Sequence, residues 1–308
     1  MSEPIIIGVD HGYAAMKTAH FSFHTGLVAH EHEPYTLSNV LEYGGKFYVA
    51  GSGRQPLQKD KTQTEDYYLL TLAAIAKELE YRNAGAVADV HLAAGLPLTS
   101  FGRDKKAFRD YLCRDGKPVS FRFEGQDYAI TISKVSLYPQ GYAAVLTQSG
   151  LLNEPSVIVA DIGGWTVDLM RLDNRIPNAA TCRSLELGMI RCLDEISEQI
   201  RRSLDLSMTA AQIESVLRSD ASHVNEDAKK IIHLEAERYT KRLLSAIAES
   251  GLDVRAMPAV FLGGGAALLK RHVSAADGLC RPVILDDVSL NAKGYEWLTE
   301  RLEQKHEQ

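Results

Sequence analysis

Two short segments of the chain share one design: a run of mostly β-branched residues, then an aspartate, then a glycine turn. A β-branched run of this kind predicts a buried strand, and the glycines predict a tight turn at its end. Each segment opens one half of the chain, which predicts two duplicated lobes. The segments are Ile5-Ile6-Ile7-Gly8-Val9-Asp10-His11-Gly12 and Val157-Ile158-Val159-Ala160-Asp161-Ile162-Gly163-Gly164.

An aspartate at the end of such a strand can face a metal–phosphate complex, while the backbone N–H groups of the turn face phosphate oxygens. A single strand-Asp-turn segment is weak evidence, because this arrangement is common. Two copies in corresponding halves indicate lobes that close on one nucleotide.

Composition excludes several other classes of protein. The 308 residues suffice for two domains, and 45% hydrophobic with 24% charged residues is typical of a soluble globular protein. The net charge is −6 and the basic residues are scattered, which argues against direct binding to nucleic acid. No apolar stretch approaches the ~20 residues of a membrane span, and the N-terminus does not resemble a signal peptide. The four cysteines form no C-x-x-C pair, so we expect neither zinc nor disulfides, and a cytoplasmic location.

The periodicity of apolar residues predicts a similar order of strands and helices in each half. Thr209 and Gln212 have the spacing of a capping box, which predicts the start of a short helix. Helices are expected at 66–81, 188–204, 226–250 and from 291 onward, strands at 5–9, 17–23, 87–97, 135–141, 157–162 and 258–262, and a hairpin at 121–133.

The first candidate loop runs from Asp10 to Lys17. A bound phosphate needs backbone donors and a cation, and Lys17 supplies the cation if the hairpin folds back. Asp10 suits Mg²⁺, with water between them, because Mg²⁺ keeps much of its hydration shell. The alternative is a surface hairpin without a ligand.

The second candidate loop runs from Asp161 to Asp168 and is the more specific one. Gly163 and Gly164 let the backbone approach a phosphate closely, and Thr166 adds a hydroxyl donor. We expect Asp161 to face Asp10 with the metal between them, since the two carboxylates would otherwise repel. Asp168 has an alternative role in holding the loop.

Two further features lie outside these loops. Gly263-Gly264-Gly265 follows an apolar strand and precedes a helix, so a flat group could lie on its backbone; the alternative is a simple turn. Gln140 stands at a break between the halves and could orient a water molecule for attack on a phosphate. Its spacing alone favours a helix cap. No G-x-x-x-x-G-K-[ST] loop is present, which excludes a P-loop NTPase.

In this order, strand-Asp-x-Gly, a linker glutamine, strand-Asp-x-Gly-Gly-x-Thr and strand-Gly-Gly-Gly resemble the actin/heat-shock-chaperone/sugar-kinase ATPase superfamily. The chain is most similar to bacterial actin-like ATPases of the ParM plasmid-segregation type. The resemblance implies an α/β, actin-like fold: two similar lobes, each with a ribonuclease-H-like mixed sheet and flanking helices, and the nucleotide in the cleft between them. It places domain I at 1–138 plus 287–308, with a small inserted subdomain and the C-terminal helix, and domain II at 139–286.

The resemblance also implies roles for individual residues. Asp10 and Asp161 hold Mg²⁺ through water and, with Gln140 as the residue that positions the hydrolytic water, form the catalytic set. Glu186 and Gly188 border the ribose, and the late glycine triplet takes the adenosine. Two residues depart from the pattern, since Tyr13 replaces a common Ser and Ala14 a common Gly. The implied nucleotide-binding set is Gly12, Tyr13, Lys17, Gly163, Gly164, Trp165, Thr166, Glu186, Gly188, Gly263, Gly264 and Gly265.

The implied function is an ATPase that polymerises into filaments with ATP and Mg²⁺, disassembles after hydrolysis and moves or segregates plasmid DNA. GTP is the alternative nucleotide. The implied partners are further copies of the chain and a DNA-binding adaptor protein on plasmid DNA, with no membrane. The alternatives are a non-polymerising chaperone-like ATPase and a small-molecule kinase of the same superfamily.

Overall fold

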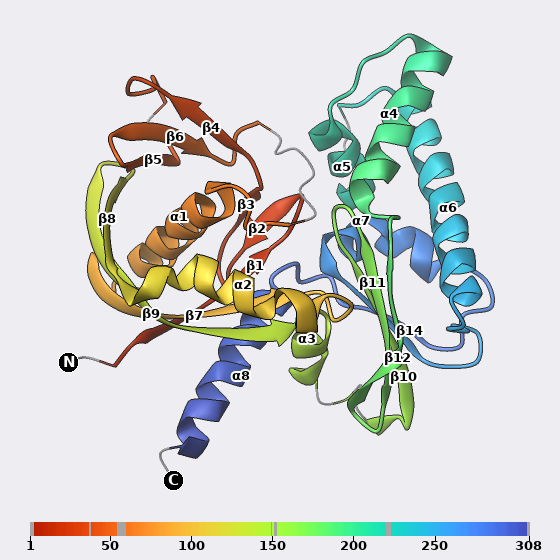
Figure 1. The fold of residues 1–308 in the computed structure, drawn as a ribbon. Coiled ribbons are helices and arrows are strands. Elements are labelled where there is room, and N and C mark those ends of the chain that lie inside the picture. Colours follow the sequence, from red (N-terminus) through yellow and green to blue (C-terminus); the bar gives the residue numbers. More distant parts are fainter. Residues whose placement is uncertain are drawn as a thin grey trace. The chain divides into compact units, whose positions relative to one another are not determined.

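The computed structural model divides the chain into two compact units, each with its own β-sheet (Figure 1). Residues 3–36, 38–53, 60–148, 150, 153–219 and 223–306 are described. Unit 1 comprises Met1–Thr147 and Ser289–Gln308, and unit 2 comprises Gln148–Val288. The predicted boundaries lie after residues 138 and 286, so Gln140, which that prediction assigns to domain II, belongs instead to unit 1.

The sheet of unit 1 has the strand order β3-β2-β1-β7-β9-β8-β5-β6-β4. The β1–β2 and β2–β3 pairs are antiparallel, whereas β1–β7 and β7–β9 are parallel. The elements of unit 1 are β1 (Ile5–His11), β2 (Ala15–Lys17), β3 (Ser22–His24), β4 (Leu27–His30), β5 (Val40–Tyr43), β6 (Lys46–Ala50), α1 (Asp66–Tyr81), β7 (Val87–Leu96), α2 (Phe101–Cys113), η1 (Arg114–Gly116), β8 (Pro118–Phe123), β9 (Gln126–Pro139), α3 (Tyr142–Leu146) and α8 (Leu290–His306).

Side-chain alternation along β1 explains why helices cover both faces of this sheet (Figure 1). Ile7 and Val9 are fully buried in the core that also contains the apolar residues of α1. Gly8 points to the other face, where a Cβ atom would lie 2.1 Å from the carbonyl oxygen of Ala292 in α8. Successive residues of a strand point to opposite faces, so α1 and α8 pack on opposite sides. Gly8 lets α8 approach the strand closely.

The sheet of unit 2 has the order β12-β11-β10-β13-β14. Its pairings along that order are antiparallel, antiparallel, parallel and parallel, the same as in β3-β2-β1-β7-β9 of unit 1. The predicted duplication of an α/β unit with a mixed sheet is therefore confirmed. The elements of unit 2 are β10 (Ser156–Ile162), β11 (Val167–Asp173), β12 (Ile176–Leu185), α4 (Met189–Leu204), α5 (Ala210–Ser219), α6 (Glu226–Glu249), β13 (Ala259–Leu262), α7 (Gly263–Ser274) and β14 (Pro282–Ile284).

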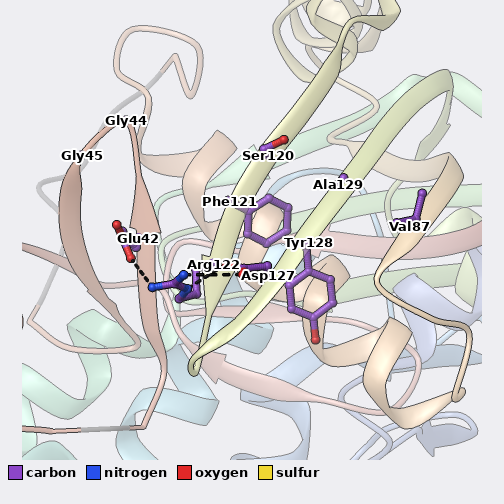
Figure 2. Close-up of a pocket in the computed structure, with 10 residues that line it drawn as sticks. All are labelled: Glu42, Gly44, Gly45, Val87, Ser120, Phe121, Arg122, Asp127, Tyr128 and Ala129. Atoms are coloured by element: carbon purple, nitrogen blue, oxygen red, sulfur yellow. Dashed lines mark hydrogen bonds and ion pairs between the residues drawn. The ribbon is translucent and has the colours of Figure 1, made fainter.

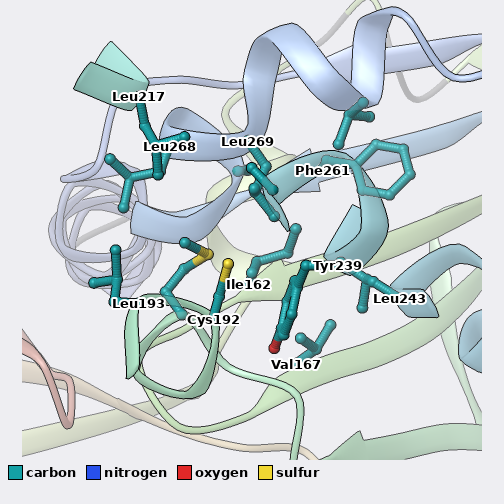
Figure 3. Close-up of a cluster of buried hydrophobic side chains, with 14 of the residues drawn as sticks. Ile162, Val167, Cys192, Leu193, Leu217, Tyr239, Leu243, Phe261, Leu268 and Leu269 are labelled. Carbon is teal, nitrogen blue, oxygen red and sulfur yellow. The ribbon is translucent and has the colours of Figure 1, made fainter. Parts of the chain in front are cut away.

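The helices of unit 2 bury one core against its sheet, and Figure 3 shows the centre of that core. Ile162 and Phe261 from the strands, Leu243 from α6 and Leu269 from α7 are all fully buried. Burial of one such side chain contributes roughly 1.5–3 kcal/mol. This packing anchors the ends of β10 and β13, from which two of the predicted loops leave.

The predicted elements differ from the observed ones mainly at turns. The strand predicted at 17–23 is wrong, because Thr18 and Phe21 form a turn there, with the Thr18 N–H donating to the Phe21 carbonyl at 2.8 Å. The predicted hairpin is formed by β8 and β9, and β9 continues through most of the strand predicted at 135–141. The capping box is confirmed: the Gln212 N–H donates to the Thr209 hydroxyl at 3.3 Å, and the Thr209 N–H to the Gln212 side chain at 2.9 Å. No helix in the described ranges combines the length and apolar character that crossing a membrane requires.

A buried histidine links α8 to the sheet of unit 1. His91 is 1% exposed; its Nδ1 lies 2.7 Å from a Glu303 carboxylate oxygen and its Nε2 lies 2.8 Å from the Ser136 hydroxyl. A carboxylate accepts only, so Nδ1 carries the proton when the ring is neutral and Nε2 accepts from Ser136. Burial lowers the pKa of His91 more than Glu303 raises it, so its pKa lies below the usual value.

We expect His91 to make the chain less stable as the pH falls below about 6.5, the usual histidine pKa. Between the folded and unfolded pKa values the unfolded state binds more protons, so acidification favours unfolding, by at most about 1.4 kcal/mol per pH unit for one proton. Urea unfolding at several pH values between 7.5 and 5 measures this slope. His91→Gln should reduce it, and an unchanged slope in that variant would contradict the prediction.

Candidate functional site

The loop between β1 and β2 has the geometry that the sequence predicts. The strand register places Asp10 opposite Lys17, and Lys17 Nζ lies 3.2 Å from Asp10 Oδ2. At Gly12 a Cβ atom would lie 2.5 Å from the carbonyl oxygen of Ala15, so the tight turn requires glycine there. The predicted return of Lys17 to Asp10 is thus found, and the loop holds a cation beside a buried carboxylate.

Gln140 joins this loop from the end of β9. Its side-chain nitrogen donates to Asp10 Oδ1 at 2.9 Å, and its side chain is buried. The next residue, Gly141, has φ +72°, and its N–H donates to Asn291 Oδ1 of α8 at 2.9 Å. No side chain caps α3, so the helix-cap interpretation of Gln140 is wrong. Gln140 and Lys17 together occupy both oxygens of Asp10.

The environment keeps Asp10 ionised. Burial raises the pKa of this carboxyl group, but the positive charges of Lys17 and Lys61 and the hydrogen bonds from Lys17 and Gln140 outweigh that effect. The net result is a pKa below the usual value. A buried carboxylate that stays charged suits a metal or a metal-bound water.

Lys61 is a member of this site that the sequence analysis missed. It precedes α1, is 8% exposed, and its ammonium group donates to the carbonyl oxygen of His11. The same nitrogen lies 4.8 Å from the ring centroid of Tyr13 and 5.4 Å from that of Tyr67. Its neighbours in the sequence are polar and show no periodicity, so no local signal distinguishes this lysine.

His11 anchors the loop and is not charged. Its Nε2 lies 2.9 Å from the Thr71 hydroxyl, whose proton goes to the Tyr67 carbonyl at 2.6 Å, so Nε2 donates to Thr71. Burial, followed by the charge of Lys61, lowers the pKa of His11 to about 3. The imidazole is therefore neutral at pH 7 and is held within the unit by α1.

The loop between β10 and β11 repeats the register of the first, with Asp161 opposite Asp168. Asp168 thus stands where unit 1 has Lys17. It accepts hydrogen bonds from the hydroxyl groups of Thr166, at 3.1 Å, and Ser184. Thr166 thus donates to Asp168 in this structure, and its contact with a phosphate stays a prediction. The alternative role of Asp168, holding the loop, matches this geometry.

Helix α4 begins directly on this second loop. Its first two N–H groups donate to the carbonyls of Gly163 and Gly164 at 3.0 and 2.9 Å, and the Gly188 N–H donates to the Trp165 carbonyl at 2.8 Å. A Cβ atom on Gly188 would lie within 2.5 Å of the backbone of Gly164 and Trp165. Gly188 is therefore required by the contact between loop and helix. Glu186, which was predicted near the ribose, is exposed just after β12.

The three glycines after β13 are not equivalent. Gly263 has φ +88°, and a Cβ atom there would lie 2.4 Å from Asp161 Oδ1. A Cβ atom on Gly265 would lie 2.2 Å from the side chain of Ile162. At Gly264 nothing lies within 4 Å of that position. Gly263 and Gly265 therefore allow α7 to pack closely against β10 and Asp161. Of the three glycines, only Gly264 leaves open space for a flat group.

The described residues suit Mg²⁺ only together with a ligand. Asp10 and Asp161 offer the carboxylate oxygens that Mg²⁺ prefers, but no group of three or more His, Cys, Asp or Glu among the described residues could hold a metal ion. Mg²⁺ commonly binds through one or two carboxylates plus phosphates and water. Each carboxylate by itself thus fits Mg²⁺ that arrives with a nucleotide, and their joint binding of one ion stays a prediction.

A pocket of about 450 Å³ lies on unit 1 apart from these loops (Figure 2). Phe121 and Tyr128 contribute rings to its wall, and Arg122 pairs with Asp127 at 2.7 Å and with Glu42 at 3.4 Å. These three charges are paired with one another, and none of the predicted nucleotide-binding, catalytic or metal-binding residues lines this pocket. It is therefore no part of the candidate site.

Comparisons with known proteins match both halves of the chain to actin-related families. Residues 8–142 match the actin like proteins N terminal domain, and residues 159–275 match the archaeal actin homologue MreB-like C-terminal domain. An archaeal actin homolog of Thermoplasma volcanium is 24% identical over 96% of this chain and 99% of its own length.

Solved structures show the same fold. The archaeal actin homolog Ta0583 in complex with ADP has a TM-score of 0.74 and 21% identity, covering 96% of this chain and 99% of that one. A 15-stranded ParM filament from Clostridium botulinum has a TM-score of 0.75 and 18% identity, covering 97% and 100%. The two family matches lie in opposite halves of the chain and together span most of the sequence, so the resemblance noted from the loops is confirmed: the chain is similar to actin-like proteins, with ParM and archaeal actin homologues among its structural neighbours.

Proposed function

We propose that this protein binds ATP with Mg²⁺, hydrolyses it, and assembles into filaments that disassemble after hydrolysis. The observation that carries the proposal is the duplicated loop at the end of β1 and β10, with a buried aspartate in each copy. Asp10 is held by Lys17 and Gln140, and Asp161 lies against Gly263.

Hydrolysis of a phosphoanhydride depends mainly on positioning and charge neutralisation, so no nucleophilic side chain is needed. Asp10 and Asp161 would hold Mg²⁺ through water, and the bound metal would supply positive charge to neutralise the phosphates. Lys17 and the loop glycines bind phosphate oxygens, and Gln140 orients the attacking water. The pairing of Asp10 with Asp161 on one metal ion remains a prediction.

The adenosine is assigned to the start of α7, where Gly264 leaves open space. Support for a nucleotide comes from the archaeal actin homolog Ta0583, which was solved in complex with ADP. Support for self-assembly comes from the ParM filament of Clostridium botulinum. By the same resemblance we propose that the filament moves or segregates plasmid DNA in the cytoplasm through a DNA-binding adaptor.

Pelleting and light scattering of the purified protein test assembly, with Mg²⁺ and either ATP, GTP, ADP or no nucleotide. We expect assembly with a triphosphate and its reversal as phosphate is released. Absence of assembly over a wide range of protein concentrations would contradict the filament. Phosphate release measured in the same samples reports on hydrolysis separately, and its absence would contradict the ATPase.

Gln140→Ala should slow hydrolysis by about 10²-fold, because a group that positions or polarises the attacking water contributes at that scale. The affinity for ATP should change much less. Phosphate release at saturating ATP gives the rate, and Gln126→Ala, at the exposed first residue of β9, is the matched control. Equal rates in both variants would leave Gln140 with only the role of holding Asp10.

A further inference from the structure

Lys61 places a second ammonium group at the loop after β1. It comes from the segment before α1, and its nitrogen contacts the carbonyl oxygen of His11, the residue that follows Asp10. Burying a charged amino group is costly unless nearby groups compensate it. The site provides compensation through this carbonyl and through Asp10, whose pKa Lys61 lowers. A charge retained in so buried a position must be held there by specific contacts.

Two aromatic rings fix the position of this ammonium group. Tyr13 belongs to the loop itself and Tyr67 to the first turn of α1, and their ring centroids lie 4.8 and 5.4 Å from Lys61 Nζ. Cation–π attraction operates within about 6 Å and strengthens when the pair is shielded from water. His11, which accepts from Lys61, is in turn fixed by Thr71. The ammonium group is thus pre-positioned by both the loop and the helix.

We propose that Lys61 is a second phosphate-binding cation of this loop, beside Lys17, and that it favours a nucleoside triphosphate over the diphosphate. The inference rests on the proposed binding of ATP and adds to it a residue that distinguishes between nucleotide states. Two ammonium groups, those of Lys17 and Lys61, lie at this loop together with the carboxylate of Asp10. Two cations held at one loop suit a polyanion.

The preference for the triphosphate follows from charge. The magnesium complex of ATP carries about one more negative charge than that of ADP, and attraction to a fixed cation grows with the charge of its partner. Removing the ammonium group should therefore weaken ATP binding more than ADP binding. A lysine that only braced the loop would, on removal, weaken both to the same extent.

Isothermal titration calorimetry with Mg²⁺–ATP and Mg²⁺–ADP tests this proposal on the full chain. In Lys61→Met we expect ATP affinity to fall at least about tenfold and ADP affinity less than about threefold. Lys61→Arg keeps the charge and should keep most of the preference for ATP. Lys105→Met, at an exposed position of α2, is the matched control and should leave both affinities unchanged.

Equal losses for both nucleotides, or no loss, in Lys61→Met would overturn the proposal. If that variant does not fold, the wild-type chain gives the answer: acetylation of Lys61, followed by mass spectrometry, should be slower with ATP than with ADP, and equal rates would overturn the proposal. Failure of the wild type to bind either nucleotide would contradict the proposed function itself. If the wild type binds both nucleotides and Lys61→Met keeps the wild-type ratio of ATP affinity to ADP affinity, only the role of Lys61 would be contradicted.

Discussion

Replacing Asp161 by alanine should lower the rate of ATP hydrolysis by about 10²-fold or more. The carboxylate is buried at the end of β10, where Gly263 packs against its oxygen. Preorganised groups that stabilise charge in the transition state are each worth about 10²–10³ in rate. Phosphate release at saturating Mg²⁺–ATP measures the loss.

The same variant separates assembly from hydrolysis. If hydrolysis drives disassembly, Asp161→Ala filaments should persist with ATP, which pelleting over time would detect. Asp277→Ala changes an exposed aspartate of the same unit and should behave as the wild type. An Asp161→Ala protein that is folded by circular dichroism and hydrolyses ATP at the wild-type rate would show that this carboxylate has no hydrolytic role.

The features that the sequence predicts best are local ones. A β-branched strand, a glycine turn and a returning strand lie within a few residues of each other, so the pairing of Asp10 with Lys17 follows from hairpin geometry. The same logic places Asp161 opposite Asp168, and the repeated pattern predicts the duplicated sheets. The loop glycines, such as Gly12, are likewise predictable, because a side chain there would collide with the backbone of the same turn.

Contacts between distant parts of the chain could not be predicted from such local sequence patterns. Gln140 reaches Asp10 only because β9 pairs with β7, which pairs with β1. Lys61 reaches His11 through the packing of the segment before α1. Neither contact leaves a periodic or spacing signal, which is why spacing favoured a helix cap for Gln140 and gave Lys61 no role.

The glycine triplet is a second feature whose individual roles cannot be predicted from the sequence, and here the difference can be tested. Its sequence gives three identical residues, but their surroundings differ: Gly263 has a left-handed backbone and faces Asp161, whereas Gly264 has open space beside it. A substitution of Gly263 should therefore impair folding, whereas a substitution of Gly264 should impair nucleotide binding. The pair distinguishes a glycine that the fold requires from one that the ligand requires.

Gly263→Ala should destabilise unit 2 and lower hydrolysis together. The left-handed backbone alone costs an alanine roughly 1–2 kcal/mol, and its Cβ atom would also displace the Asp161 carboxylate. For a chain of this size each kcal/mol corresponds to a drop in melting temperature of roughly 2–4 °C. Thermal unfolding and phosphate release measure the two effects.

Gly264→Ala is the matched substitution and should retain or slightly raise the melting temperature, because alanine favours a helix and meets no atom within 4 Å. Its affinity for ATP should nevertheless fall, since a methyl group would occupy the space assigned to the adenosine. Calorimetric titration with ATP checks this, and unchanged affinity in a stable Gly264→Ala protein would move the adenosine away from the start of α7. Equal melting temperatures for the two variants would contradict the different structural roles assigned to these adjacent glycines.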